Sequence, residues 1–205
     1  MKSTNSRTLK MVQLALFIAV IILMAFTPIG YIKTPGVEIT LLIVPVTVGA
    51  IVLGPTAGAI LGGAFGLTSF IQCFGMSPFG SALLGINPIA TFILCLVPRI
   101  LMGWISGITF QAVKKVDKTK SVSYLVGSLV GPILNTVFFM LALVLFFYNT
   151  DYIQGFVEVL NAKNAFFFVV AFVGINGLIE AGINFVIGSA VAKTLAVVVE
   201  RVKVK

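Results

Sequence analysis

The chain alternates between long apolar stretches and short polar segments. A helix needs about 20 apolar residues to cross a bilayer, and six stretches reach or approach that length. The predicted spans are 9–29, 39–53, 56–74, 89–113, 122–148 and 165–199. The sixth is too long for one bilayer at about 1.5 Å per residue, so it either projects into water or starts later. The pattern predicts an all-α integral membrane protein, a single domain over residues 1–205 built as a compact bundle of six transmembrane helices.

Basic residues are distributed unevenly over the segments between the predicted spans. Six spans place both termini on one side, and with the N-terminus inside, the outer segments hold only Lys33 and Lys163. The inner segments hold Lys2, Arg7, Lys10, Lys114, Lys115, Lys118, Lys120, Lys193, Arg201, Lys203 and Lys205. Because Lys and Arg collect in cytoplasmic segments, both termini are predicted to be cytoplasmic. The loops 31–38, 75–88 and 149–164 then face outside.

The composition agrees with a membrane protein and excludes some partners. The chain is 59% hydrophobic and 10% charged, whereas soluble domains carry about 25% charged residues. The net charge of +8 would suit nucleic acid, but the basic residues lie in short clusters beside the spans, which positive-inside topology explains. No nucleic-acid partner is therefore expected. The apolar run 9–29 is long for a signal peptide and lacks a small-x-small cleavage site, so it is predicted to be an uncleaved first helix.

Several residue types that carry enzyme chemistry are missing from the sequence. There is no His, the commonest metal ligand and acid–base group. Cys73 and Cys95 lie in apolar runs at a spacing that matches no metal motif, so they are predicted to pack as small hydrophobes. A P-loop of the form GxxxxGK[ST] is also missing. No enzyme activity, cofactor or metal is expected, and if the chain moves a solute, another subunit is expected to supply the energy. A self-sufficient secondary transporter is the alternative, although the matched halves with broken helices of that class are not evident.

Polar residues inside the predicted spans are the candidates for a solute site. Asn176, Glu180 and Asn184 follow one another at a four-residue spacing, which places them on one helix face. Arg99 follows Pro98 at about the middle of the fourth span. Charges at such depth are costly unless they pair or face a cavity. Glu180 and Arg99 are therefore expected to form a salt bridge, to bind a solute, or to do both, with Arg99 as the counter-charge of an anionic group. The Asn-Glu-Asn face either lines the site or forms an interhelical hydrogen-bond network.

Weaker signals add residues to this set. Asn135 lies near the middle of the fifth span, after Gly131-Pro132, and is a candidate hydrogen-bonding partner. Asn87 precedes Pro88 and either caps the fourth helix or contributes to the site. Tyr31 is an aromatic candidate for stacking on a ligand ring. Three further aromatic candidates are Phe74, Phe79 and Trp104, of which Trp104 lies deep in the fourth span.

Small residues recur at four-residue spacing in two places. Gly54, Gly58, Gly62 and Gly66 form a ridge that lets another helix backbone approach closely, and packing within the chain is the favoured interpretation. Ala15 and Ala19 form a shorter pair of the same kind in the first span.

Four segments of the chain together resemble a known family. They are FTPIGYI, VPVTVGAIVLGPTAGAILGGAFGLTSF, VPRILMGW and NGLIEAGINFVIG. In order and spacing they resemble the substrate-binding S component of an energy-coupling factor (ECF) vitamin transporter, over nearly the whole chain. Within that family the pattern is most similar to the pantothenate branch, with riboflavin and hydroxymethylpyrimidine as alternative substrates.

The resemblance implies a function, partners and a location. It implies capture of a small vitamin from outside a bacterial cell by a multi-pass subunit of the plasma membrane. The partners would be a transmembrane coupling subunit, contacted through Ala15 and Ala19, and two ABC ATPase subunits. The vitamin site would lie near the outer surface, and its predicted lining is Tyr31, Asn87, Arg99, Asn135, Asn176, Glu180 and Asn184.

Overall fold

The computed structural model describes residues 2–28, 30–33, 38–117 and 122–194, and within them the side chains of 7–28, 30–31, 40–117, 122–174, 181–183 and 185–194. Helices dominate the described residues. In chain order the elements are α1 (Lys2–Ala25), β1 (Tyr31–Lys33), β2 (Glu38–Thr40), α2 (Ile43–Leu53), α3 (Pro55–Gln72), α4 (Pro78–Ile86), α5 (Pro88–Val116), α6 (Val122–Phe147), α7 (Asp151–Val159), α8 (Ala165–Ile183) and the π-helix η1 (Asn184–Gly188).

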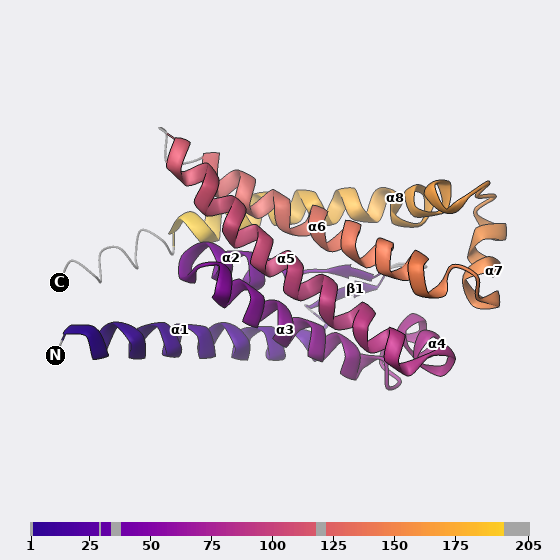
Figure 1. Ribbon diagram of the computed structural model, residues 1–205, viewed down its shortest axis with the longest axis horizontal. Helices are drawn as coiled ribbons and strands as arrows, with labels where there is room; N and C mark the ends of the chain where they lie inside the picture. Colours follow the sequence, from indigo (N-terminus) through magenta and orange to yellow (C-terminus); the bar gives the residue numbers. More distant parts are fainter. Residues whose placement is uncertain (1, 29, 34–37, 118–121, 195–205) are drawn as a thin grey trace.

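The long helices run roughly along the long axis of the molecule (Figure 1). The start of α1, the end of α5 and the start of α6 lie at one end, and the short helices α4 and α7 lie at the other (Figure 1). Helix α5 packs against α3 on one side and against α6 on the other, and α6 in turn packs against α8. This order places α5, with Arg99, between the two halves of the bundle.

The outer surface of the bundle suits lipid rather than water. Within the described residues, three helical segments are long and apolar enough to cross a membrane: Arg7–Ala25, Pro88–Val116 and Val122–Phe147. Large apolar side chains on these helices point outward, among them Leu23 at 67% exposure and Leu145 at 77%. Contiguous apolar surface of this extent is unfavourable in water. The prediction of an all-α membrane protein is therefore confirmed.

Each of the six predicted stretches contains a helix, but the segments between them differ from the prediction. The segment 31–38 was expected to be a loop, and instead β1 and β2 pair as an antiparallel ladder with Tyr31 opposite Thr40. The second helix consequently begins at Ile43 rather than at residue 39. Bonding along this ladder satisfies backbone groups that would otherwise need water.

Two predicted outer loops contain helices. Helix α4 forms within 75–88 because Pro78 starts it and the Ser77 side chain accepts a hydrogen bond from the Gly80 N–H at 3.3 Å. Helix α7 forms within 149–164 and has Asp151 in its first turn, where a negative charge is favourable. Both helices cover the same end of the bundle (Figure 1).

The predicted sixth span is interrupted rather than continuous. Gly174 has φ 38° and ψ −130° inside α8, a conformation that favours glycine and breaks the regular helix. A π-helical turn then begins at Asn184. A π turn changes the angular position of every residue after it, so the sixth span is not a single straight helix.

The glycine ridge brings α3 and α5 into backbone contact. A Cβ added at Gly58 would clash with the Gly103 carbonyl, one at Gly62 with the Arg99 carbonyl, and one at Gly66 would lie 2.8 Å from the carbonyl oxygen of Cys95. The contacts on α5 are themselves spaced by four residues, so two antiparallel ridges match turn for turn. The prediction that these glycines pack within the chain is confirmed.

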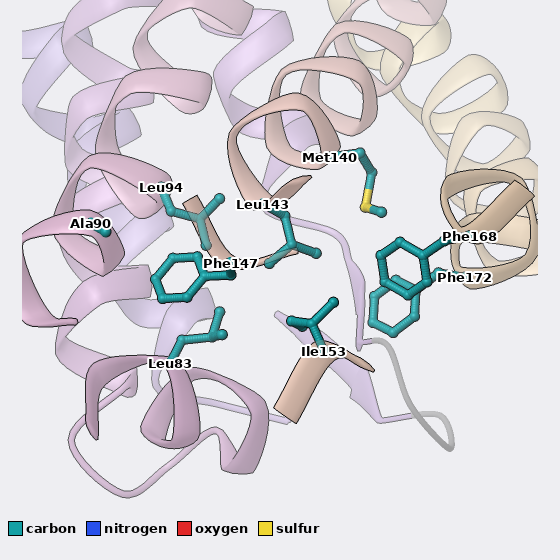
Figure 2. Packing of buried hydrophobic residues seen from close by; sticks show 9 residues of the cluster. All are labelled: Leu83, Ala90, Leu94, Met140, Leu143, Phe147, Ile153, Phe168 and Phe172. Carbon is teal, nitrogen blue, oxygen red and sulfur yellow. The ribbon is translucent and has the colours of Figure 1, made fainter. Parts of the chain in front are cut away.

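Side chains rather than backbone fill the end of the bundle that α4 and α7 cover (Figure 2). There α4, α5, α6, α7 and α8 share an apolar cluster, with Leu143, Phe147, Ile153 and Phe168 fully buried. Tyr152 and Phe156 of α7 and Phe79 of α4 extend this cluster through ring contacts of 5.3 to 6.2 Å. We refer to it below as the aromatic cluster. It anchors α4 and α7 to the long helices.

Candidate functional site

The Arg99 side chain is restrained by a backbone carbonyl that its own helix leaves without a helical donor. Pro98 lacks an N–H, so the carbonyl of Leu94, four residues earlier, has no helical donor from that position. The Nη1 of Arg99 donates to this carbonyl at 2.7 Å. The proline therefore creates an acceptor in the middle of an apolar helix, and the neighbouring arginine satisfies it.

Two aromatic rings from different helices enclose the guanidinium. Its Cζ lies 5.5 Å from the ring centroid of Phe65 on α3 and 4.8 Å from that of Phe139 on α6. Both distances are within the range of cation–π attraction, which is stronger where water is excluded. The charge is therefore stabilised by ring faces and one carbonyl, and no carboxylate among the described side chains, which do not include that of Glu180, pairs with it.

Arg99 Nε and Asn135 Oδ1 are both buried without a hydrogen bond to any described side chain or backbone group. Asn135 is 8% exposed and precedes Phe139 by four residues on α6, an axial offset of about 6 Å. One atom is a charged donor and the other an acceptor. A buried polar atom without a partner is unfavourable by about 1–3 kcal/mol, so this region is suited to a ligand that offers an acceptor and a donor.

A polar face of α3 continues from Phe65 toward α4. Ser69 and Gln72 follow it at four and seven residues, on the same side of the helix. The Tyr31 hydroxyl and Ser69 Oγ lie 3.2 Å apart, within hydrogen-bond distance. Gln72 Nε2 donates to the Ala25 carbonyl at 2.5 Å and so ties α3 to the end of α1. Strand β2 also packs against α8, so the β1–β2 ladder contacts both α3 and α8.

The arrangement is suited to a small polar anion. A guanidinium with one donor already used presents its remaining edge to a carboxylate, and charge-assisted bonds of this kind are about twice as strong as neutral ones. The rings of Phe65 and Phe139 offer apolar contact on either side. Among the described residues no group of three or more His, Cys, Asp or Glu gathers to hold a metal ion.

The structure brings some of the predicted residues together and leaves others apart. Arg99 lies beside Phe139, which follows Asn135 by four residues on α6, and Tyr31 reaches the α3 face that carries Phe65 through Ser69. Asn87 is exposed at the start of α5, and its Oδ1 accepts a hydrogen bond from the Ala90 N–H at 3.0 Å. The predicted capping role of Asn87 is therefore confirmed, while its contribution to the site stays a prediction.

The predicted Asn-Glu-Asn face lies outside the described side chains. The backbone of Asn176 and Glu180 is in α8, and Asn184 is the first residue of η1. A pair between Glu180 and Arg99 stays a prediction for the same reason. Ala15 and Ala19 are both exposed on α1, so their face is not covered by the described part of the chain.

The aromatic candidates separate into two groups. Phe79 belongs to the aromatic cluster, where it lies 5.7 Å from Phe172. Phe74 is 67% exposed and Trp104 is 47% exposed, so both lie on the outer surface rather than beside Arg99.

Four residues of the site were not predicted from the sequence. Ser69 and Gln72 are polar residues in an apolar helix, and that rarity was a usable signal. Phe65 and Phe139 gave no signal, because the chain has 18 phenylalanines and their position beside Arg99 depends on how α3, α5 and α6 pack.

Comparison with known proteins agrees with this reading of the fold. Residues 9–192 match the family model described as "ECF transporter, substrate-specific component". The chain is also 28% identical to the pantothenate transporter PanT of Leuconostoc mesenteroides subsp. mesenteroides, over 98% of this chain and 99% of that protein. Family and relative are transporter components and not enzymes. With a family model that spans nearly all of its length, this multi-pass membrane protein belongs to the substrate-specific components of ECF transporters.

Proposed function

We propose that this substrate-specific component captures pantothenate at the outer face of a bacterial plasma membrane. The single observation that carries the proposal is the Arg99 guanidinium, enclosed by Phe65 and Phe139 with its Nε buried and without a partner among the described residues. A cation kept in this state at mid-bundle favours an anionic ligand. The name of the relative PanT supplies the candidate substrate.

Pantothenate matches the groups that surround Arg99. Its one carboxylate would neutralise the guanidinium and accept a hydrogen bond from Nε. Its hydroxyl and amide groups provide donors for Asn135 Oδ1, which is buried and unsatisfied among the described residues. Its two methyl groups would lie against the phenyl rings. Tyr31, Ser69 and Gln72 would close the site from the side of the β1–β2 ladder.

The predicted topology and partners belong to the same proposal. Six spans would place both termini in the cytoplasm, with α4 and α7 on the outer side of the membrane. Ala15 and Ala19, which are exposed on α1, would contact a transmembrane coupling subunit that works with two ABC ATPase subunits. Asn176, Glu180 and Asn184 would complete the site from α8 and η1, and Asn87 would contribute at its outer end.

Isothermal titration of the purified protein in detergent tests the substrate. Pantothenate is titrated first, followed by riboflavin, hydroxymethylpyrimidine, thiamin, folate and biotin. We expect nanomolar affinity for pantothenate, a binding free energy of about −12 kcal/mol. Nanomolar binding of another vitamin, with none for pantothenate, would refute the proposed substrate.

Variants of Arg99 test the role of the guanidinium. Arg99→Met should abolish pantothenate binding while the protein still elutes as a folded monomer. Arg99→Lys keeps the charge but loses the planar donors, so it should bind more weakly by at least about tenfold. Lys115→Met removes one positive charge from the last turn of α5 and serves as the matched control. Equal affinity of Arg99→Met and Lys115→Met would contradict a direct role for Arg99.

A further inference from the structure

The two cysteines of the chain meet between α3 and α5. Cys73 is the C-cap residue that directly follows α3, and Cys95 lies one turn before Arg99 on α5. Their sulfur atoms are 3.9 Å apart, and the residues are 4% and 6% exposed. Residues 22 positions apart in the sequence are thus in side-chain contact, although the sequence predicted no relation between them.

The position of Cys73 is fixed by its neighbours. Its Sγ donates to the Ser69 carbonyl at 3.4 Å, and its own carbonyl accepts a hydrogen bond from Ser81 Oγ at 2.8 Å. Gly80 of α4 packs against the same sulfur, so closely that an added Cβ would lie 2.6 Å from it. These contacts hold the thiol toward α5.

The backbones of α3 and α5 come close to one another near the two cysteines. At Gly66, less than two turns before Cys73, an added Cβ would lie only 2.8 Å from the Cys95 carbonyl. A disulfide needs a sulfur separation of about 2.05 Å. Rotation about the side-chain bonds together with a small approach of the chains would bring the sulfurs from 3.9 Å to that distance.

We propose that Cys73 and Cys95 form a modification site at which a small neutral peroxide converts the two thiols into a disulfide. One thiolate attacks a peroxide oxygen and becomes a sulfenic acid, and the O–O bond breaks with release of one water. The second sulfur attacks the sulfenic sulfur, the S–S bond forms and a second water leaves. Two thiols are oxidised and one hydrogen peroxide is reduced to two waters, so atoms and electrons balance.

The bond would act on the neighbouring site. Ser69, which bonds Cys73 through its carbonyl, also contacts the Tyr31 hydroxyl, and Arg99 lies one turn from Cys95. A disulfide removes the donor to the Ser69 carbonyl and fixes the end of α3 to α5 one turn from Arg99. Couplings between sites are typically about 5–150-fold, and we expect the disulfide to weaken ligand binding by about tenfold. This second effect rests on the proposed function.

The test uses the full chain in detergent, reduced and then treated with hydrogen peroxide. Intact mass and alkylation after denaturation report the disulfide, and titration with pantothenate reports binding. We expect the treated protein to lose the mass of two hydrogen atoms and both alkylation sites, and to regain its sites and its affinity with dithiothreitol. Cys73→Ala and Cys95→Ala each keep one thiol, so neither forms the bond within the chain, and both should keep their affinity after peroxide.

The outcomes separate this inference from the proposed function. Two alkylatable thiols after peroxide treatment would overturn the modification site. A complete disulfide with unchanged affinity would overturn its effect on the ligand. If the reduced protein binds no pantothenate, the proposed substrate fails, while mass and alkylation still decide whether the two sulfurs form the bond.

Discussion

The α3–α5 pair and the aromatic cluster are held together in different ways. Between α3 and α5 the contact is backbone on backbone, with Gly58, Gly62 and Gly66 against carbonyls of α5. In the aromatic cluster the helices are kept apart by rings such as Phe147, Phe168 and Phe172 (Figure 2). A helix backbone cannot relieve a close contact by changing rotamer, whereas the aromatic side chains can adjust by small rotations.

The two regions therefore differ in how far they can adjust to a ligand. The α3–α5 pair fixes the position of Arg99 along the bundle axis, because the Arg99 carbonyl is itself one of the contact points of the glycine ridge. The other region holds the short helices α4 and α7, together with α8, which is broken at Gly174. We infer that the first region supplies a rigid reference and the second supplies the elements that adapt to a ligand.

The largest expected effect comes from breaking the backbone contact. Gly62→Ala places a methyl group against the Arg99 carbonyl, and the helices must separate to accommodate it. We expect a loss of about 3 kcal/mol or more in stability, seen as a lower melting temperature in detergent and a smaller folded yield.

Gly63→Ala is the matched control for that change. Its Cβ would lie 3.7 Å from Ile100 Cγ1, an ordinary contact, and alanine favours the helix. We expect unchanged or slightly higher stability. Equal losses from the two substitutions would show that the ridge does not depend on backbone contact.

A smaller effect is expected from the aromatic cluster. Phe168 is fully buried there, and Phe168→Ala removes packing against Tyr148 and Phe172. We expect a loss of about 2 kcal/mol, below the range for soluble cores, because the surrounding lipid is as apolar as the cluster. Phe166→Ala, at a position 71% exposed, is the control. A loss from Phe168→Ala as large as that from Gly62→Ala would remove the contrast between the two regions.

The smallest effect concerns the pH dependence of α7. Burial raises the pKa of Tyr152 above its ordinary value near 10, because the apolar surroundings disfavour the phenolate. The folded state thus holds the phenolic proton more tightly than the unfolded state. The stabilisation is fully present below the unfolded pKa and is lost as the pH rises through the folded pKa.

The melting temperature, measured from pH 9 to pH 11.5, should fall somewhat more steeply for the wild type than for Tyr152→Phe. Identical slopes for the two proteins would show that the ring is not desolvated in the cluster.

Apolar length and small-residue spacing were sufficient to predict the helices of the six apolar stretches and the close packing of the glycine ridge within the chain. The six stretches were visible because lipid requires long uninterrupted apolar helices, and the glycine ridge because only close packing explains four glycines at one spacing. The pairing of β1 with β2 and the helices α4 and α7 were not predicted, since these elements are short and depend on contacts with distant segments.

The site was only partly predictable for a related reason. Arg99 and Asn135 were found because polar residues in membrane helices are rare. Phe65 and Phe139 are ordinary apolar residues, and their role depends on which faces of α3 and α6 meet α5. The contact between Cys73 and Cys95 likewise depends on the register of two helices, which no local pattern encodes.

The proline at position 98 has a consequence for affinity as well as for structure. A long arginine side chain carries about 2 kcal/mol of rotational entropy, and a ligand that had to immobilise it would bind more weakly by part of that amount. Here the carbonyl of Leu94 restrains Arg99 before any ligand arrives. Pro98 need not contact the ligand. Because of it, the Arg99 side chain loses its rotational entropy when the helix folds rather than when the ligand binds.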